Sequence, residues 1–140
     1  MIEFVFNTGA VLDDKKNVLD WLETLAHNEG FSIKNICYSF VSVEKIQSIN
    51  KQFLNHDFPT DVIAFDYSEG KHLSGDVFVC QEVVEQNAYD HAQTIENETL
   101  RVLCHALFHL CGYKDKSDND LAVMRLVEDK AIATFKTTHK

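Results

Sequence analysis

The sequence has no long apolar run and no basic segment at its start. The first nine residues carry no lysine or arginine, and no apolar stretch reaches the length needed to cross a bilayer. We therefore expect a soluble cytoplasmic protein without a secretory signal. Proline is also scarce, with one residue in 140, and no repeat, linker or low-complexity tract divides the chain. A chain of this length that is 45% hydrophobic predicts one domain over residues 1–140.

Neither paired cysteines nor positive charge is prominent. The four cysteines lack C-x-x-C spacing, which argues against a disulfide framework. We expect them to be small buried side chains. Cys104 and Cys111 are alternative candidates for soft metal ligands. The formal net charge is −9. Sequence-independent binding of nucleic acid normally uses clustered lysine and arginine, so this charge opposes that class of protein. It leaves room for a local basic or metal-centred site.

Hydrophobic periodicity predicts an α+β fold. Alternating apolar residues predict strands over residues 2–7, 35–41, 61–67 and 76–80. Helical spacing predicts helices from Asp13 or Asp14 to Gly30, after Ser42, over residues 81–92 and 97–111, and after a Ser117–Asp120 capping box. The order, βαβαββ followed by helices, predicts a small mixed four-stranded sheet packed against a helical layer.

Two of these helices have clear apolar faces that we expect to be buried. The helix after Ser42 presents the inner-face residues Ile46, Ile49, Asn50 and Phe53. The last helix presents the inner-face residues Leu121, Met124, Val127, Ala131 and Phe135.

The most informative segment is His105-Ala-Leu-Phe-His109-Leu-Cys-Gly112-Tyr-Lys-Asp115. Two histidines four residues apart on a helix lie on one face, one turn apart, so both imidazoles can reach one ion. Gly112 suits the left-handed residue that ends a helix, and the chain reversal there can bring Asp115 round as a third ligand. Three protein ligands and an open position are typical of a catalytic zinc site. The segment thus predicts one transition metal per chain, most simply Zn²⁺, although imidazole ligands also suit other transition metals.

The same residues occur with two upstream motifs. These are Asn50-Lys-Gln-Phe53, and Pro59-Thr-Asp61-Val62-Ile-Ala-Phe65 followed by Gly75-Asp76-Val77. In this combination the chain resembles the YbeY family of metal-dependent endoribonucleases over nearly its whole length. The resemblance implies a zincin-like metal site on a helix of the C-terminal half. It also implies single-strand-specific cleavage in 16S rRNA 3′-end maturation and ribosome quality control, with ribosomal RNA and the ribosome or its associated proteins as partners.

The sequence departs from the family pattern at two positions. The third ligand is usually histidine in the family, and Asp115 stands there; an aspartate oxygen is also an acceptable zinc ligand. The family usually has an arginine after the aromatic residue of the Asn-x-x-aromatic motif, and Leu54 stands there. Leucine cannot hold a phosphate, so part of that charge has to come from elsewhere. A protonated His56 is one source of this charge. The alternative is that His56 is an ordinary exposed histidine of the loop without this role.

An open zinc site suits phosphodiester cleavage because the ion polarises phosphoryl oxygens and lowers the pKa of bound water. The ligand spacing also resembles that of the metzincin proteases, so a zincin-type metalloprotease is the alternative enzyme class. Those proteases carry glutamate after the first histidine as general base, whereas Ala106 has no proton-handling group. RNA carries its own nucleophile in the 2′-OH, which favours a nuclease.

Two further residues are candidates near the metal. Asp61 begins a strand that, by the resemblance, runs near the metal, and its carboxylate can orient a ligand histidine; otherwise it is a strand-start residue. Arg101, one turn before His105, can contact a phosphate. The alternative role for Arg101 is a surface ion pair with Glu98 or a neighbour. A non-enzymatic alternative also stays open. It is a ribosome-assembly factor whose zinc only holds the last helices together, which a fourth ligand such as Cys111 or Asp118 would favour.

Overall fold

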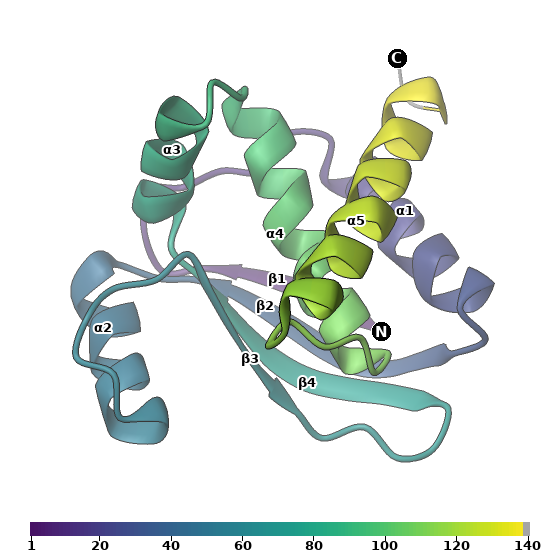
Figure 1. Ribbon diagram of the computed structural model, residues 1–140, viewed down its shortest axis with the longest axis horizontal. Helices are drawn as coiled ribbons and strands as arrows, with labels where there is room; N and C mark the ends of the chain where they lie inside the picture. Colours follow the sequence, from purple (N-terminus) through teal and green to yellow (C-terminus); the bar gives the residue numbers. More distant parts are fainter. Residues whose placement is uncertain (139–140) are drawn as a thin grey trace.

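The computed structural model describes residues 1–138, with four strands and five helices in that range, in the predicted order (Figure 1). The strands are β1 (Ile2–Phe6), β2 (Ser32–Phe40), β3 (Val62–Asp66) and β4 (His72–Val79). The helices are α1 (Lys15–Asn28), α2 (Val43–Leu54), α3 (Gln81–Asp90), α4 (Ile95–Leu110) and α5 (Asp118–Thr138). The predicted α+β class is confirmed. Within residues 1–138 no helix has the length and apolar character of a membrane span.

The four strands form one mixed sheet in the order β1-β2-β4-β3. β1, β2 and β4 are parallel, and β3 runs antiparallel to β4 at the edge. β4 begins at His72, earlier than predicted, because residues 72–75 already pair with β2. The sequence did not predict this first part of β4 because most of its residues are polar. Its buried positions, Leu73 and Gly75, alternate with the polar ones.

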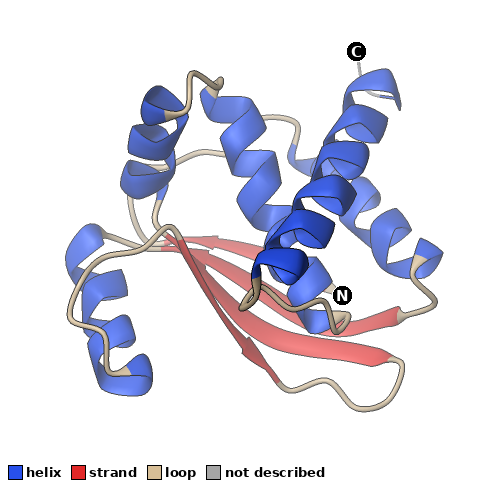
Figure 2. Cartoon of the chain, viewed as in Figure 1, coloured by secondary structure: helices blue, strands red, loops and turns tan. Residues whose placement is uncertain are grey.

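The main core lies between one face of the sheet and the helices α1, α4 and α5, which Figure 2 shows stacked on that face. Leu73, Val77 and Val79 of β4 point into it and are completely buried. α4 lies at its centre, with Leu103 and Leu107 fully buried. Removing such a set of aliphatic side chains from water is the main source of stability in a domain of this size.

Gly75 allows the C-terminal end of α4 to pack closely on β4. A Cβ atom at this position would lie 2.5 Å from the carbonyl oxygen of Phe65 and 3.2 Å from Cδ2 of Leu110. Real Cβ atoms do not approach a backbone oxygen so closely, so any larger residue would push β3 or α4 away. The glycine of the Gly-Asp-Val motif is therefore needed for packing, and it helps to set the position of α4, the helix that carries His105 and His109.

A smaller apolar cluster lies on the opposite face of the sheet, where α2 packs against β3. The Ser42 hydroxyl caps α2 by accepting from the backbone N–H of Lys45 at 3.1 Å. Ile46, Ile49 and Asn50 are buried as predicted. Phe53 is not: it is 59% exposed, and its ring contacts that of the β3 residue Phe65 edge to face beside an open pocket between α2 and the sheet.

α5 begins at the predicted capping box. The Ser117 hydroxyl accepts from the backbone N–H of Asp120 at 3.0 Å, and the Asp120 carboxylate accepts from that of Ser117 at 3.3 Å. The predicted inner face is wrong at Leu121, which is 50% exposed, whereas Val127 is partly buried and packs against the core. The residues that α5 buries are Met124, Glu128, Ala131, Ile132 and Phe135. The first turn of α5 is uncovered because a cleft opens there.

Candidate active site

α4 carries both histidines of the predicted metal segment. The Thr94 hydroxyl caps its N-terminus by accepting from the backbone N–H of Asn97 at 3.0 Å, and acidic residues in the first turn favour the helix dipole. Most of its circumference is buried, as expected of a central helix. His105 and His109 lie on the remaining side: the His105 side chain is 27% exposed, and His109 is more exposed.

A buried carboxylate holds the ring of His105. Oε2 of Glu128, on α5, lies 2.6 Å from Nδ1 of His105, and the Glu128 side chain is only 5% exposed. A carboxylate accepts hydrogen bonds, so Nδ1 carries the proton and its N–H donates a hydrogen bond to Glu128. In the neutral form of the ring, Nε2 is then the nitrogen that carries the lone pair. Histidines that bind metal ions are commonly oriented in this way by a carboxylate on the other ring nitrogen.

Arg101 holds Glu128 in place. Its guanidinium lies 3.0 Å from Oε1 of Glu128 and 2.7 Å from Oδ1 of Asp129, with Glu98 at 3.9 Å. Its side chain is 16% exposed. The structure thus contains the ion pair with Glu98 that the sequence suggested, together with two shorter ones across to α5. A guanidinium engaged by three carboxylates supports a positioning role for Arg101 rather than a free phosphate contact.

The chain reversal after α4 brings Asp115 to His105. Gly112 has a φ of +106°, and the backbone N–H of Tyr113 donates to the carbonyl of Phe108 at 3.0 Å, which closes the end of the helix. Oδ2 of Asp115 then lies 3.4 Å from Nε2 of His105. Burial lowers the pKa of His105, but the hydrogen bond to Glu128 and the charges of Glu128, Asp115 and Asp61 raise it overall. The surroundings of this imidazole therefore favour a cation.

The structure brings together two of the three predicted ligands. Among residues 1–138 no group of three or more histidine, cysteine, aspartate and glutamate side chains is gathered closely enough to hold a metal ion. The donor set nevertheless fits a transition metal, because an oriented imidazole and a carboxylate face each other with His109 one helical turn away. Cys111, named as a fourth ligand for a structural site, is partly buried, and this burial raises the pKa of its thiol to about 12.

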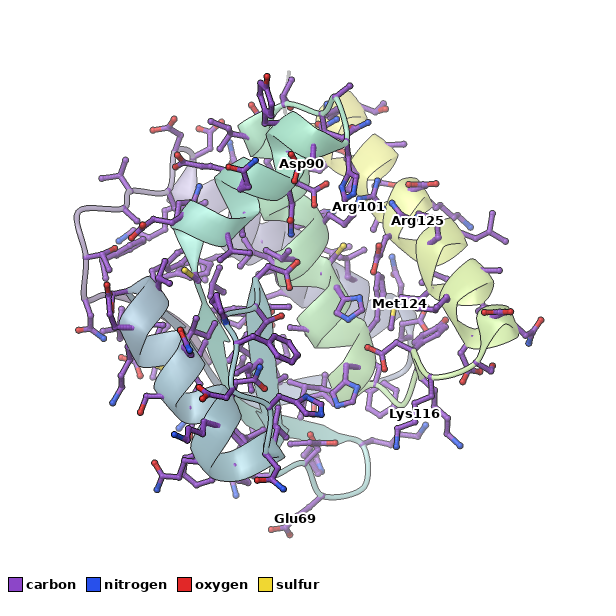
Figure 3. All side chains as sticks on the ribbon, turned by 60° about the vertical axis from the view of Figure 1, so that its left-hand side comes forward. Glu69, Asp90, Arg101, Lys116, Met124 and Arg125 are labelled. Carbon is purple, nitrogen blue, oxygen red and sulfur yellow. The ribbon has the colours of Figure 1, made fainter. Side chains whose placement is uncertain are left out.

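His105 lines a cleft of about 520 Å³ between β3 and the helices α3, α4 and α5. The polar and charged residues of its wall are Asp61, Asn87, His91, Glu98, Arg101, Arg125 and Glu128. Its apolar wall consists of Val62, Val102, Leu121, Ala122 and Met124. Figure 3 looks at this side of the molecule and labels Arg101, Met124 and Arg125. Charged and apolar groups therefore meet in the wall of this cleft.

Asp61 lies in this cleft, but it is not the residue that orients His105 through a hydrogen bond. Its carboxylate accepts from the hydroxyl of Thr60 and from the amide of Asn87, both at 3.4 Å. The orienting carboxylate is Glu128, which the sequence analysis missed. The signal for it was a charged residue at the inward spacing of α5, four residues after Met124 and three before Ala131.

The two loop residues discussed for phosphate binding are both exposed. Leu54 is the last residue of α2 and is 46% exposed. His56 is exposed, and its ring stacks on that of Phe58 with centroids 5.4 Å apart. Neither lines the cleft that contains His105.

Comparison with known proteins agrees with the fold and the motifs. Residues 7–136 match the family model described as Endoribonuclease YbeY. Endoribonuclease YbeY of Flavobacterium johnsoniae is 45% identical over 135 residues, which are 96% of this chain and 97% of that protein. Endoribonuclease YbeY of Phocaeicola vulgatus is 40% identical over 119 residues, covering 85% and 86% of the two chains. A Thermotoga maritima protein with a known solution structure superimposes with a TM-score of 0.66 at 26% identity, covering 99% of this chain and 94% of that one.

We predict that the purified protein holds close to one equivalent of a transition metal, and that His105→Ala, His109→Ala and Asp115→Ala each lose most of it. Removing one of three ligands should weaken binding by more than about tenfold. Inductively coupled plasma mass spectrometry measures the occupancy, with His27→Ala, an exposed histidine of α1, as the control that keeps its metal. Asp115→His should also keep metal. Full occupancy in all three alanine variants would contradict the ligand set.

Proposed function

Because the chain belongs to the YbeY family, we propose that it is a metal-dependent endoribonuclease that cleaves single-stranded RNA during 16S rRNA 3′-end maturation and ribosome quality control. The observation that carries the proposal beyond the family match is the arrangement of His105. Its ring is held by buried Glu128 at 2.6 Å, and its free nitrogen faces Asp115 beside a cleft. An imidazole oriented in this way suits metal binding better than a surface role.

His105, His109 and Asp115 are the residues proposed to hold the metal, with zinc the simplest choice. His109 is exposed one helical turn beyond His105, on the same side of α4, which is the spacing at which two imidazoles can share one ion. A bound Zn²⁺ supplies Lewis-acid stabilisation of charge on phosphoryl oxygens and lowers the pKa of bound water.

The protein's own residues have positioning roles in this proposal. Glu128 keeps the proton of His105 on Nδ1, and Arg101 holds the Glu128 carboxylate in place through a charge-assisted hydrogen bond. Asp61 adds negative charge at the cleft wall and is itself held by Asn87. We assign no direct contact with RNA to Arg101, whose guanidinium already has three carboxylate partners.

The two alternatives have less support. Ala106 is 1% exposed and faces the core, so residue 106 offers no general base for peptide hydrolysis. The open cleft beside His105 is not expected of a zinc ion with only a structural role. We therefore favour the nuclease over both the metalloprotease and the zinc-stabilised assembly factor.

We also propose that the RNA is presented to the enzyme on a ribosomal particle or by a ribosome-associated protein. The enzyme would then act in the cytoplasm. A chain with a net charge of −9 repels phosphates at long range, and it has Leu54 where relatives are expected to carry arginine. Tethering the substrate raises its effective concentration without new contacts at the cleft.

We predict that metal-loaded protein cleaves single-stranded RNA and does not hydrolyse casein. His109→Ala should reduce cleavage by at least about a hundredfold, because losing a ligand removes the metal that stabilises phosphoryl charge. Gel analysis of end-labelled RNA measures the products, with His27→Ala as the control variant. Casein hydrolysis that depends on His105 would instead favour the protease. A substrate with 2′-deoxyribose at the cleavage site identifies the nucleophile, since undiminished cleavage there would show that it is water.

We predict that the isolated protein binds free RNA weakly, with a shallow salt dependence, and that Leu54→Arg strengthens binding by about three- to tenfold at low salt. The added positive charge should increase the affinity for RNA if the exposed end of α2 faces the substrate. Fluorescence anisotropy measures both affinities. Val11→Arg adds the same charge at another exposed position and should have little effect. Tight, steeply salt-dependent binding by the wild-type protein would contradict the need for presentation.

A further inference from the structure

The cleft beside His105 has two polar groups on its wall that the proposed mechanism does not use. They are Arg125, on α5, and His91, which follows α3. The two groups approach the same cleft from different helices. Both side chains are exposed, and within residues 1–138 neither makes a hydrogen bond or an ion pair through its side chain.

The carboxylates of the same wall already have partners. Glu98 and Glu128 pair with Arg101, and Glu128 also accepts from His105. Asp61 accepts from Thr60 and Asn87, which are neutral groups, so it has hydrogen-bond partners but keeps its negative charge. Once these internal pairs are accounted for, the wall offers an unpaired guanidinium and an unpaired imidazole. Both can donate hydrogen bonds, and a guanidinium cannot accept them, so Arg125 fits an anionic ligand.

The chain contains only two arginines, and this makes Arg125 distinctive. Arg101 is committed to three carboxylates. Both arginines lie within the described residues 1–138, and of the two it is Arg125 whose planar, always-charged group remains available for bidentate binding of a phosphate. It lies on the same helix as Glu128, three residues earlier. The residue that orients His105 and the free arginine are therefore fixed relative to each other by a single helix.

The rest of the wall indicates what else the ligand contains. Val62, which is partly exposed, and Leu121, which is 50% exposed, provide an apolar surface next to these donors. A nucleotide presents the same combination, with an apolar base face and a charged phosphate. The cleft of about 520 Å³ falls within the range of roughly 300–1,000 Å³ that is usual for sites that enclose small ligands.

We propose that Arg125, assisted by His91, binds a backbone phosphate of the RNA at a nucleotide next to the cleaved one. This inference rests on the proposed function and adds a substrate contact to it. In this chain the contact would supply part of the phosphate binding that Leu54 cannot provide. Arg125 is thus a substrate-binding residue, and the affinity for RNA should depend on its charge more than the rate of the chemical step does.

The test compares Arg125→Gln with Lys130→Gln, an exposed residue of α5 outside the cleft that loses the same charge. Binding of a short single-stranded RNA to chelator-treated protein is measured by anisotropy over a series of NaCl concentrations. Each phosphate contact contributes about 0.7 to the slope of log K against log salt for a single strand. Arg125→Gln should therefore lower the slope by about this amount, Arg125→Lys should restore it, and Lys130→Gln should leave it unchanged.

Cleavage kinetics of the metal-loaded protein give a second measurement. Arg125→Gln should raise KM about fivefold while kcat stays within about twofold, and His91→Ala should raise KM to a smaller extent. If wild-type protein cleaves RNA and Arg125→Gln changes neither the slope nor KM, this inference is wrong and the proposed function stands. If wild-type protein neither binds nor cleaves RNA, both are wrong. Equal effects of Arg125→Gln and Lys130→Gln would also overturn the inference, since they would show only a general effect of charge.

Discussion

The buried carboxylate of Glu128 is the interaction on which the site depends. It accepts from Nδ1 of His105 and from the guanidinium of Arg101, so one residue of α5 joins two residues of α4. An unpaired charge at 5% exposure would be strongly unfavourable, and both partners are needed to offset its desolvation. The same contact fixes the tautomer of His105 and the position of α5 against α4. The geometry that suits metal binding and the packing of the last helix thus have a common origin.

The other parts of the site follow from local backbone chemistry on a rigid base. Gly75 lets α4 lie close to β4, and Gly112 turns the chain so that Asp115 comes back toward His105. The Tyr113 hydroxyl donates to the Glu29 carboxylate at 2.8 Å and ties this turn to the residue that follows α1. The turn is therefore supported from two directions, by the closed end of its own helix and by a distant part of the chain. Such support is what a metal ligand in a short loop needs to keep its geometry.

Features that depend on short-range spacing were predictable from the sequence. The histidine pair, the glycine that ends α4, the Ser117–Asp120 capping box and the class of fold all depend on residues a few positions apart. The features that were missed depend on contacts between distant elements. Helical periodicity cannot say where a pocket lies beside a helix, and for this reason Phe53 and Leu121, which both line pockets, were wrongly expected to be buried. Glu128 was missed because its partners lie 23 and 27 residues away, on another helix.

The most direct test of the account measures the dissociation constant of Zn²⁺ for Glu128→Gln and Asp129→Asn by chelator competition. Both residues pair with Arg101, but only Glu128 contacts His105. A glutamine at position 128 has one acceptor oxygen for two donors, so it must present an N–H group to His105 or to Arg101. We predict that Glu128→Gln weakens Zn²⁺ binding by about 10- to 100-fold, while Asp129→Asn stays within about threefold of wild type. Equal affinities for the two variants would contradict the claim that Glu128 orients His105 for a metal ion.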